Sequence, residues 1–284
     1  MKVLKEKRCI IGEGPIWNER EQALYFTNGF QKEICIYNFK TEQMHIRTLP
    51  FGASAIAFEE QGNLILSHAG GVHILTNDDT LIPLYAPEKY AIKRASDMKI
   101  GPDGAIYVGT ISEKFLGISE KLDGKLYRIS QGGKVDILLD GLSLSNGLEW
   151  SMDETKFYHA DTGKAEIKEY YFDKATGEIK FSGRKVCVEG ADGLTIGRDN
   201  CLYVSCAWKK YVAVVDCATL SIISYISPPK TFPMSCCFCG TNMDVLAITT
   251  ASDTADLEKD ENAGFTVLAK QNVNGKKPYL FKCL

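Results

Sequence analysis

Short apolar runs separated by turn-forming residues fill this chain, and one arrangement of them occurs six times. In each copy a polar residue precedes an apolar run, a tight turn and a second apolar run. This order predicts two antiparallel strands joined by a hairpin. The copy that begins at Asn146 passes through the turn 152–155 and returns in the run 156–160, and a copy of the same design begins at Asp192.

The polar residues that open the six copies, called anchors below, recur at a regular spacing. They are Glu13, Ser54, Ser96, Asn146, Asp192 and Ser235, with gaps of 41, 42, 50, 46 and 43 residues. A period of roughly 40–50 residues built only from strands and turns is typical of a β-propeller. The sequence therefore predicts an all-β fold, a six-bladed β-propeller in which residues 1–284 form a single domain.

The two ends of the chain are expected to close the ring of blades. We expect residues 1–11 to supply an edge strand that pairs with the last apolar segments, 264–268 and 279–281, because this leaves no open sheet edge. The irregular insertion 111–123 falls between the second and third strands of the third copy. Connections of this kind lie over one end of a propeller channel, so the insertion is a candidate pocket wall.

Composition and charge narrow the possible partners. The formal net charge is −3, which disfavours nucleic acid and anionic membranes. No apolar run approaches the roughly 18 residues of a membrane span, and the charged start does not resemble a signal peptide. Most of the ten cysteines lie in strand-like runs, as free buried thiols do. We therefore expect reduced thiols and a cytoplasmic location, and leave the oligomeric state open between monomer and dimer.

Three of the anchors carry side chains that can hold a metal ion. In a propeller the first strand of every blade lines the central channel, so Glu13, Asn146 and Asp192 should converge near one end of it. Carboxylate and amide oxygens suit Ca²⁺, our preferred ion, or Mg²⁺ and Mn²⁺, with Zn²⁺ as a further candidate. Three protein ligands leave open positions, as in a catalytic site. Taken singly, Asn-Gly and Asp-Gly are ordinary turn sequences.

Three segments make this pattern similar to that of a known family. Residues 12–17, 145–151 and 191–193 resemble, in order and spacing, the marker segments of the family of senescence marker protein 30, gluconolactonase and luciferin-regenerating enzyme. The likeness covers essentially the whole chain and is nearest to the bacterial-type sugar lactonases. It implies a propeller with one divalent cation in the channel, held by Glu13, Asn146 and Asp192. It also implies hydrolysis of sugar lactones, with Asp192 as the general base.

The resemblance extends to residues that would contact the substrate. Arg94 and Glu120 stand where lactonases of the family carry an Arg and a Glu that bind the sugar. Ser96 departs from the pattern, because those enzymes have Asn there. A small-molecule sugar lactone is thus the expected partner, with its orientation altered by the shorter hydroxyl of Ser96.

Two other functions are consistent with the same sequence. One is an esterase or organophosphate hydrolase of the same family, because an open metal site polarises many kinds of ester. The other is a non-catalytic binding scaffold in which the cation only stabilises the channel. The presence of Arg94 and Glu120 beside the three ligands favours an enzyme.

Overall fold

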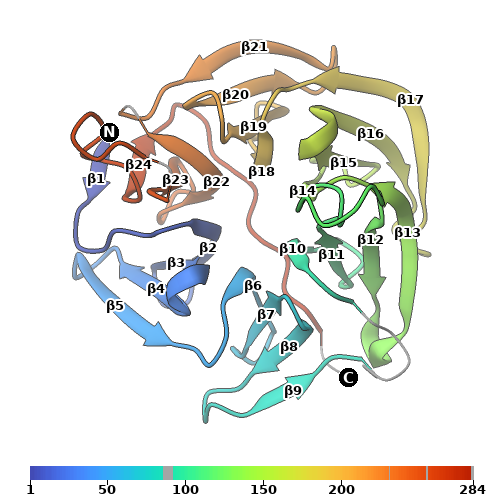
Figure 1. Cartoon of the computed structure of the whole chain (residues 1–284), viewed down its shortest axis with the longest axis horizontal. Helices are drawn as coiled ribbons and strands as arrows, with labels where there is room; N and C mark the ends of the chain where they lie inside the picture. Colours follow the sequence, from blue (N-terminus) through green and yellow to red (C-terminus); the bar gives the residue numbers. More distant parts are fainter. Residues whose placement is uncertain (86–91, 230, 254, 283–284) are drawn as a thin grey trace.

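Consecutive hairpins group the strands into four-stranded antiparallel sheets arranged around a central axis (Figure 1). The computed structural model describes residues 1–85, 92–229, 231–253 and 255–282. Within these residues there are six sheets, so the predicted all-β, six-bladed propeller is confirmed.

In blades 1 to 5 the strands run from the channel outwards in chain order, and in blade 6 the outermost strand is β1. Blades 1 to 3 contain β2 (Gly12–Asn18), β3 (Ala23–Asn28), β4 (Glu33–Asn38), β5 (Gln43–Thr48); β6 (Ala53–Phe58), β7 (Leu64–His68), β8 (Gly71–Leu75), β9 (Leu81–Pro83); β10 (Ala95–Ile100), β11 (Ile106–Thr110), β12 (Gly124–Ile129), β13 (Val135–Leu142). Blades 4 to 6 contain β14 (Ser145–Trp150), β15 (Lys156–Asp161), β16 (Glu166–Phe172), β17 (Ile179–Cys187); β18 (Ala191–Ile196), β19 (Cys201–Cys206), β20 (Tyr211–Asp216), β21 (Ser221–Ile226); β22 (Phe232–Cys239), β23 (Val245–Ala251), β24 (Thr266–Lys270) and β1 (Lys2–Leu4). Three short 3₁₀ helices, η1 (Gly29–Gln31), η2 (Gln131–Gly133) and η3 (Thr162–Lys164), lie in connections.

The N-terminal strand closes the ring, as the sequence predicts. β1 pairs antiparallel with β24, with Lys2 opposite Leu268 and Leu4 opposite Thr266. The first three strands of blade 6 thus come from the end of the chain and the fourth from its beginning, so the strand edge of β24 is covered. The expected second partner, 279–281, lies elsewhere, as described below.

The hydrophobic core lies between neighbouring blades. The innermost strands contact one another in a closed ring in the order β2, β6, β10, β14, β18 and β22. Apolar side chains fill the wedges between sheets. Between blades 3 and 4, for example, Tyr107 packs edge-on against Trp150 with ring centroids 4.7 Å apart. Because the strands are apolar on both faces, each blade packs against two neighbours and fixes the radius of the channel.

The C-terminal segment 271–282, called the tail below, crosses one end of the channel (Figure 1). It touches the ends of inner strands or the turns that follow them: Gly275 bridges Gly197 of blade 5, and the backbone of Phe281 bonds that of Phe58 and Glu60 in blade 2. This corrects the expectation for 279–281, which do not join the blade formed by the N-terminus. The tail is one continuous strap held by several blades, a placement that no local sequence pattern specifies.

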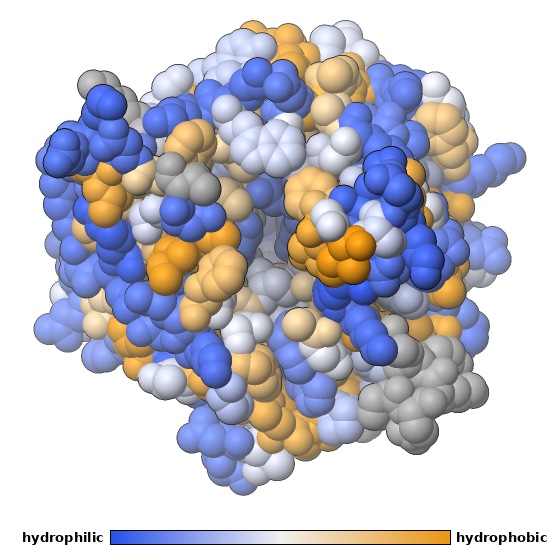
Figure 2. All heavy atoms as spheres, viewed as in Figure 1, coloured by the Kyte–Doolittle hydropathy of each residue, from blue (hydrophilic) through white to orange (hydrophobic). Residues whose placement is uncertain are grey.

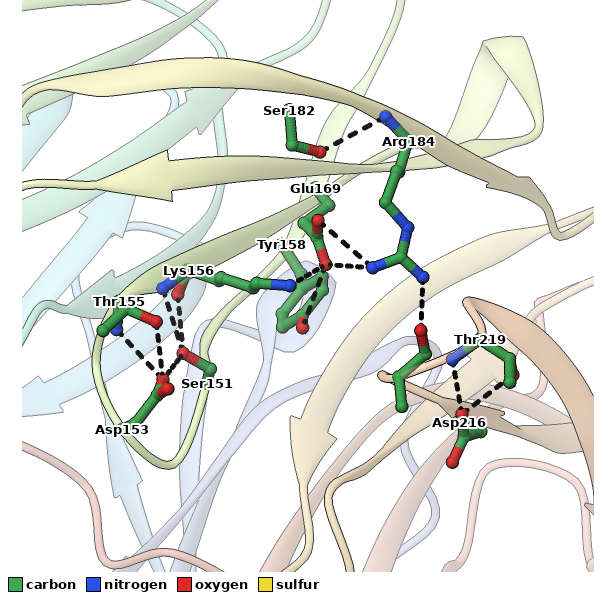
Figure 3. Close-up of polar contacts among 11 residues, drawn as sticks. Ser151, Asp153, Thr155, Lys156, Tyr158, Glu169, Ser182, Arg184, Asp216 and Thr219 are labelled. Atoms are coloured by element: carbon green, nitrogen blue, oxygen red, sulfur yellow. Dashed lines mark hydrogen bonds and ion pairs between the residues drawn. The ribbon is translucent and has the colours of Figure 1, made fainter.

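A buried carboxylate joins blade 4 to blade 5 on the outer side of the ring (Figure 3). Glu169 of β16 accepts hydrogen bonds from Lys156 Nζ at 3.0 Å and Arg184 Nη1 at 3.1 Å. Arg184 also donates to the carbonyl oxygen of Ala218 in the next blade at 2.7 Å. Two cations thus offset the cost of burying one carboxylate.

Two further observations bear on the environment of the protein. The nine cysteines within the described ranges are all free, and only Cys187 among them is exposed. Over the same ranges, no helix combines the length and the apolar character needed to cross a bilayer.

Candidate metal centre at the mouth of the channel

At the start of each inner strand the pairing register with the next strand shifts, and this shift sets the direction of the anchor side chains. In β14 the pairing with β15 shifts between Ser145 and Leu148, and in β18 it shifts between Ala191 and Leu194. Asn146 and Asp192 fall inside these irregularities. A bulge of this kind leaves its residue outside the ladder and turns the side chain away from the sheet face. Both side chains are therefore presented at the end of the channel where the inner strands begin, called the mouth below.

The glycine after each of these anchors permits close approach of neighbouring blades. A β-carbon added at Gly147 would lie 2.5 Å from the backbone oxygen of Asp192, and one added at Gly193 would lie 1.9 Å from Ser235 Oγ. Asn-Gly and Asp-Gly therefore do not form hairpin turns here. They bring blades 4, 5 and 6 into contact, which places Asn146 beside Asp192.

The structure brings the three predicted ligands together. Asn146 donates from Nδ2 to Thr162 Oγ1 at 2.9 Å, which leaves its amide oxygen for the channel. Thr162 in turn donates to the carbonyl oxygen of Ala191 at 2.6 Å, fixing the amide against the next blade. Glu13 and Asp192 lie close enough for each to affect the other's ionisation.

The electrostatics of the mouth are unbalanced. Burial raises the pKa of Glu13 well above its usual value, and the negative charges of Asp192 and Asp97 raise it further. Burial and the charge of Asp97 likewise raise the pKa of Asp192. Asp97 itself has a raised pKa because of burial, against the opposing charge of Lys99. In the described part of the chain, no ion pair to lysine or arginine reaches any of these three carboxylates.

This donor set fits a hard divalent cation. Two carboxylates and one amide group meet in a buried place where, among the described residues, no lysine or arginine forms an ion pair with the carboxylates, and the amide is fixed by its hydrogen bond to Thr162. Across the described residues there is no group of three or more His, Cys, Asp and Glu side chains placed for metal binding. The proposed set has only two carboxylates and takes its third donor from Asn146, so that observation does not conflict with it.

The residues expected to contact the substrate are placed differently from the ligands. Arg94 donates from Nε to the carbonyl oxygen of Ile111 at 2.8 Å and from Nη2 to Asp123 at 2.7 Å, so it holds the base of the insertion 111–123. The hydroxyl of Ser96 donates to the carbonyl oxygen of Ser145. Glu120 does not join the ligands: its side chain is 92% exposed and pairs with Lys114 at 2.8 Å.

Sequence reasoning missed Asp97 and Thr162. Asp97 directly follows the anchor Ser96, where blades 4 and 5 have Gly147 and Gly193, so aligning the copies would have revealed an acid in that place. Thr162 begins η3 directly after β15, 16 residues beyond Asn146, and nothing in the local sequence indicates its contact.

The other end of the channel is closed by the tail and is electrostatically balanced. Glu149 lies 2.8 Å from both Lys99 Nζ and Lys276 Nζ. Lys276 also donates to the carbonyl oxygen of Trp150 at 2.7 Å. A cavity of about 60 Å³ remains inside the channel, lined among others by Asp97, Lys99, Glu149 and Lys276. A ligand therefore has access from the mouth, opposite the tail.

Comparison with known proteins identifies the family and the fold. A family model described as SMP-30/Gluconolactonase/LRE-like region matches residues 11–252. Regucalcin of Sus scrofa is 28% identical over 288 residues, covering 98% of this chain and 96% of the relative. YvrE of Bacillus subtilis (strain 168), named for a sugar lactone lactonase activity, is 29% identical over 287 residues, covering 97% and 96%.

A solved structure has the same fold. Regucalcin from Agrobacterium tumefaciens, described as a calcium-binding protein, superposes with a TM-score of 0.87 at 21% identity, covering 98% of this chain and 96% of the other.

Proposed function

The chain belongs to the SMP-30/gluconolactonase/LRE-like family, and from this premise we propose that it is a metal-dependent hydrolase that opens lactones. The observation that carries the proposal is the group of uncompensated carboxylates at the mouth. The charges of Asp192 and Asp97 raise the pKa of Glu13, and the charge of Asp97 raises that of Asp192; in the described residues no lysine or arginine forms an ion pair with these three carboxylates. Such an arrangement costs stability unless a cation occupies it.

In this proposal Glu13, Asn146 and Asp192 hold one divalent cation, with Ca²⁺ preferred and Zn²⁺, Mg²⁺ or Mn²⁺ as alternatives. When bound, the ion supplies Lewis-acid stabilisation of the negative charge that develops on a lactone carbonyl oxygen during attack. Asn146 is held in the orientation this requires, because Thr162 occupies its Nδ2. The calcium-binding description of the Agrobacterium tumefaciens regucalcin supports the choice of ion.

Asp192 is proposed to accept a proton from the attacking water. Burial and the neighbouring charge of Asp97 raise its pKa, so its carboxylate is a stronger base than an exposed aspartate. A base needs an oxygen that is directed at the water, and the irregularity in β18 leaves the side chain of Asp192 outside the ladder, at the mouth. Arg94, which is partly exposed, holds the base of the insertion 111–123 through Asp123, while Ser96 orients the backbone beside Asn146.

A lactone panel tests this function. Hydrolysis of sugar lactones and simple lactones is followed with a pH indicator, first after chelation and then with each divalent ion added back. We expect turnover that chelation abolishes and metal restores. A protein that binds one cation but hydrolyses none of the lactones, aryl esters or organophosphates would be a metal-stabilised scaffold instead.

A further inference from the structure

Three exposed aromatic side chains lie in connections at the mouth, one against each blade that carries a proposed ligand. Phe30 is 70% exposed, Trp208 is 54% exposed and Phe115 is 37% exposed. They lie in the connection β3–β4 of blade 1, the connection β19–β20 of blade 5 and the insertion 111–123 of blade 3. Together we call them the aromatic collar.

Trp208 stands next to Asp192. The backbone nitrogen of Ala207 donates to the carbonyl oxygen of Gly190 at 2.9 Å, which holds this connection against the start of β18. A β-carbon added at Gly190 would lie 3.1 Å from the nitrogen of Trp208 and 3.5 Å from its indole ring. Gly190 precedes Asp192 by two residues, so the indole lies against the start of the strand that carries Asp192.

Phe115 stands next to Asn146. Its insertion is fixed to blade 4 by the hydrogen bond from Ser112 N to the carbonyl oxygen of Ser143 at 2.9 Å. A β-carbon added at Gly163 would lie 3.2 Å from the ring of Phe115. Gly163 adjoins Thr162, the residue that orients Asn146.

Phe30 stands on the side of Glu13. It lies in η1, which directly follows Asn28, and Asn28 pairs with Gly12 across β2 and β3. Aliphatic side chains continue the apolar surface on the insertion, where Leu116 and Ile118 are exposed. Figure 2 shows hydrophobic residues on both sides of the central hollow, with hydrophilic residues between and around them.

The polar groups expected to recognise sugar hydroxyls are already engaged. Arg94 is bonded to Ile111 and Asp123, and Ser96 to Ser145. Glu120 is directed to solvent. A polyhydroxylated ring would therefore meet aromatic surface where it needs hydrogen-bond partners.

We propose that the substrate is a lactone or ester that carries an aliphatic or aryl substituent, and that the aromatic collar binds this substituent while the ester carbonyl lies at the proposed metal centre. The inference rests on the proposed function of that same site. Large exposed apolar groups gathered at one opening mark a binding surface. Removing each methylene of a chain from water favours binding about threefold to fourfold.

A homologous series of lactones tests the collar. The metal-loaded protein is assayed with unsubstituted δ-valerolactone, with δ-lactones carrying one-, three-, five- and seven-carbon alkyl chains, and with glucono-δ-lactone. We expect kcat/KM to rise about threefold with each added methylene until the collar is filled, and glucono-δ-lactone to be a poorer substrate than the five-carbon compound. A flat series with glucono-δ-lactone preferred would overturn the inference and leave the lactonase function intact.

Variants locate the effect. Trp208→Ser and Phe115→Ser should each lower kcat/KM for the five-carbon lactone by about tenfold or more, and by a clearly smaller factor for δ-valerolactone, which carries no chain for the collar to bind. Tyr171→Ser is the matched control, because Tyr171 is 55% exposed on β16, opposite Lys156 at the tail end of blade 4. Equal losses of kcat/KM in all three variants, or no loss in the first two, would contradict the proposed role of the collar in binding the substituent.

A binding measurement separates the collar from catalysis. Trp17 and Trp150 are buried, so Trp208 is the exposed indole among the three tryptophans. The six-membered lactam with a pentyl chain, which resists hydrolysis, should shift the emission of Trp208 to shorter wavelength, and δ-valerolactam should not. This shift without turnover of any lactone would support the collar and refute the lactonase. Turnover of sugar lactones without the shift would support the lactonase and refute the collar.

Discussion

Buried carboxylates at the two ends of the channel have pKa values that are shifted in opposite directions. At the tail end Glu149 is buried between Lys276 and Lys99, and although burial opposes ionisation, the two positive charges lower its pKa to about 2. At the mouth Glu13 and Asp192 have raised pKa values, because burial and neighbouring carboxylates both disfavour their charge. Strand β10 contributes to both ends, with Asp97 at the mouth and Lys99 beside Glu149.

The difference shows which end is built for stability and which for binding. Glu149 resembles Glu169 on the outer side of the ring, where Lys156 and Arg184 provide two cations for one acid. At the mouth the chain supplies acids and an amide oxygen but no paired cation among the described residues. A ligand that binds only the folded state stabilises it, so a divalent ion would supply what Lys99 and Lys276 supply at the tail end.

The largest expected effect separates the roles of the two ligands from neighbouring blades. Asp192→Asn keeps an oxygen donor but cannot accept a proton, so we expect lactone turnover to fall by roughly 10²–10⁴-fold even at saturating metal. Asn146→Ala should instead raise the metal concentration needed, with activity partly recovered by excess ion. Steady-state kinetics over a metal titration distinguishes the two, and full recovery of Asp192→Asn would show that it is a ligand only.

The balanced end should be sensitive to loss of a single cation. Lys276→Met leaves Glu149 buried with one partner instead of two, and we expect a loss of about 3–5 kcal/mol in the free energy of unfolding. Lys277→Met is the matched control, because Lys277 pairs with Glu19 on the surface and should change stability by less than about 1 kcal/mol. Urea unfolding of both variants measures the difference, and equal stability would mean that the tail does not secure this end.

The two ends should respond to pH with opposite sign. The pKa of Glu149 is lowered, so its contribution to stability is complete above about pH 4.5 and is lost as pH falls toward 2. The pKa of Glu13 is raised, so without metal its cost appears as pH rises above the unfolded value and is complete above the raised one.

Glu13→Gln should therefore raise the Tm of the metal-free protein at neutral pH. We expect a gain of about 1–3 kcal/mol, with the difference from the native chain shrinking as pH approaches 4. Differential scanning calorimetry of chelated samples measures it. A lower Tm for Glu13→Gln at pH 7 would contradict the imbalance at the mouth.

Sequence was informative where the chain repeats itself. The six anchors specify the blades and bring Glu13, Asn146 and Asp192 to one end, because equivalent positions of a repeat occupy equivalent places around an axis. The tail could not be predicted in this way. It has no strand periodicity. The role of Lys276 depends on its ion pair with Glu149, which lies more than a hundred residues earlier in the chain.

The smallest expected effect concerns Glu120. Because its side chain is exposed and its partner Lys114 is half-exposed, Glu120→Ala should leave kcat/KM within about twofold and the stability unchanged. Steady-state kinetics on the lactone panel measures the first quantity and urea unfolding the second. A large loss of lactone affinity would show that the insertion closes over the mouth when substrate binds.

Calorimetric titration of the chelated protein with Ca²⁺ tests most directly that the mouth carboxylates form a cation site. We predict one ion bound per chain, with protons released on binding because Glu13 and Asp192 have raised pKa values in the free protein. Glu13→Gln and Asp192→Asn should weaken binding strongly, and Glu120→Gln should not. An absence of binding for Ca²⁺, Mg²⁺, Mn²⁺ and Zn²⁺, or binding unchanged in the first two variants, would contradict the account.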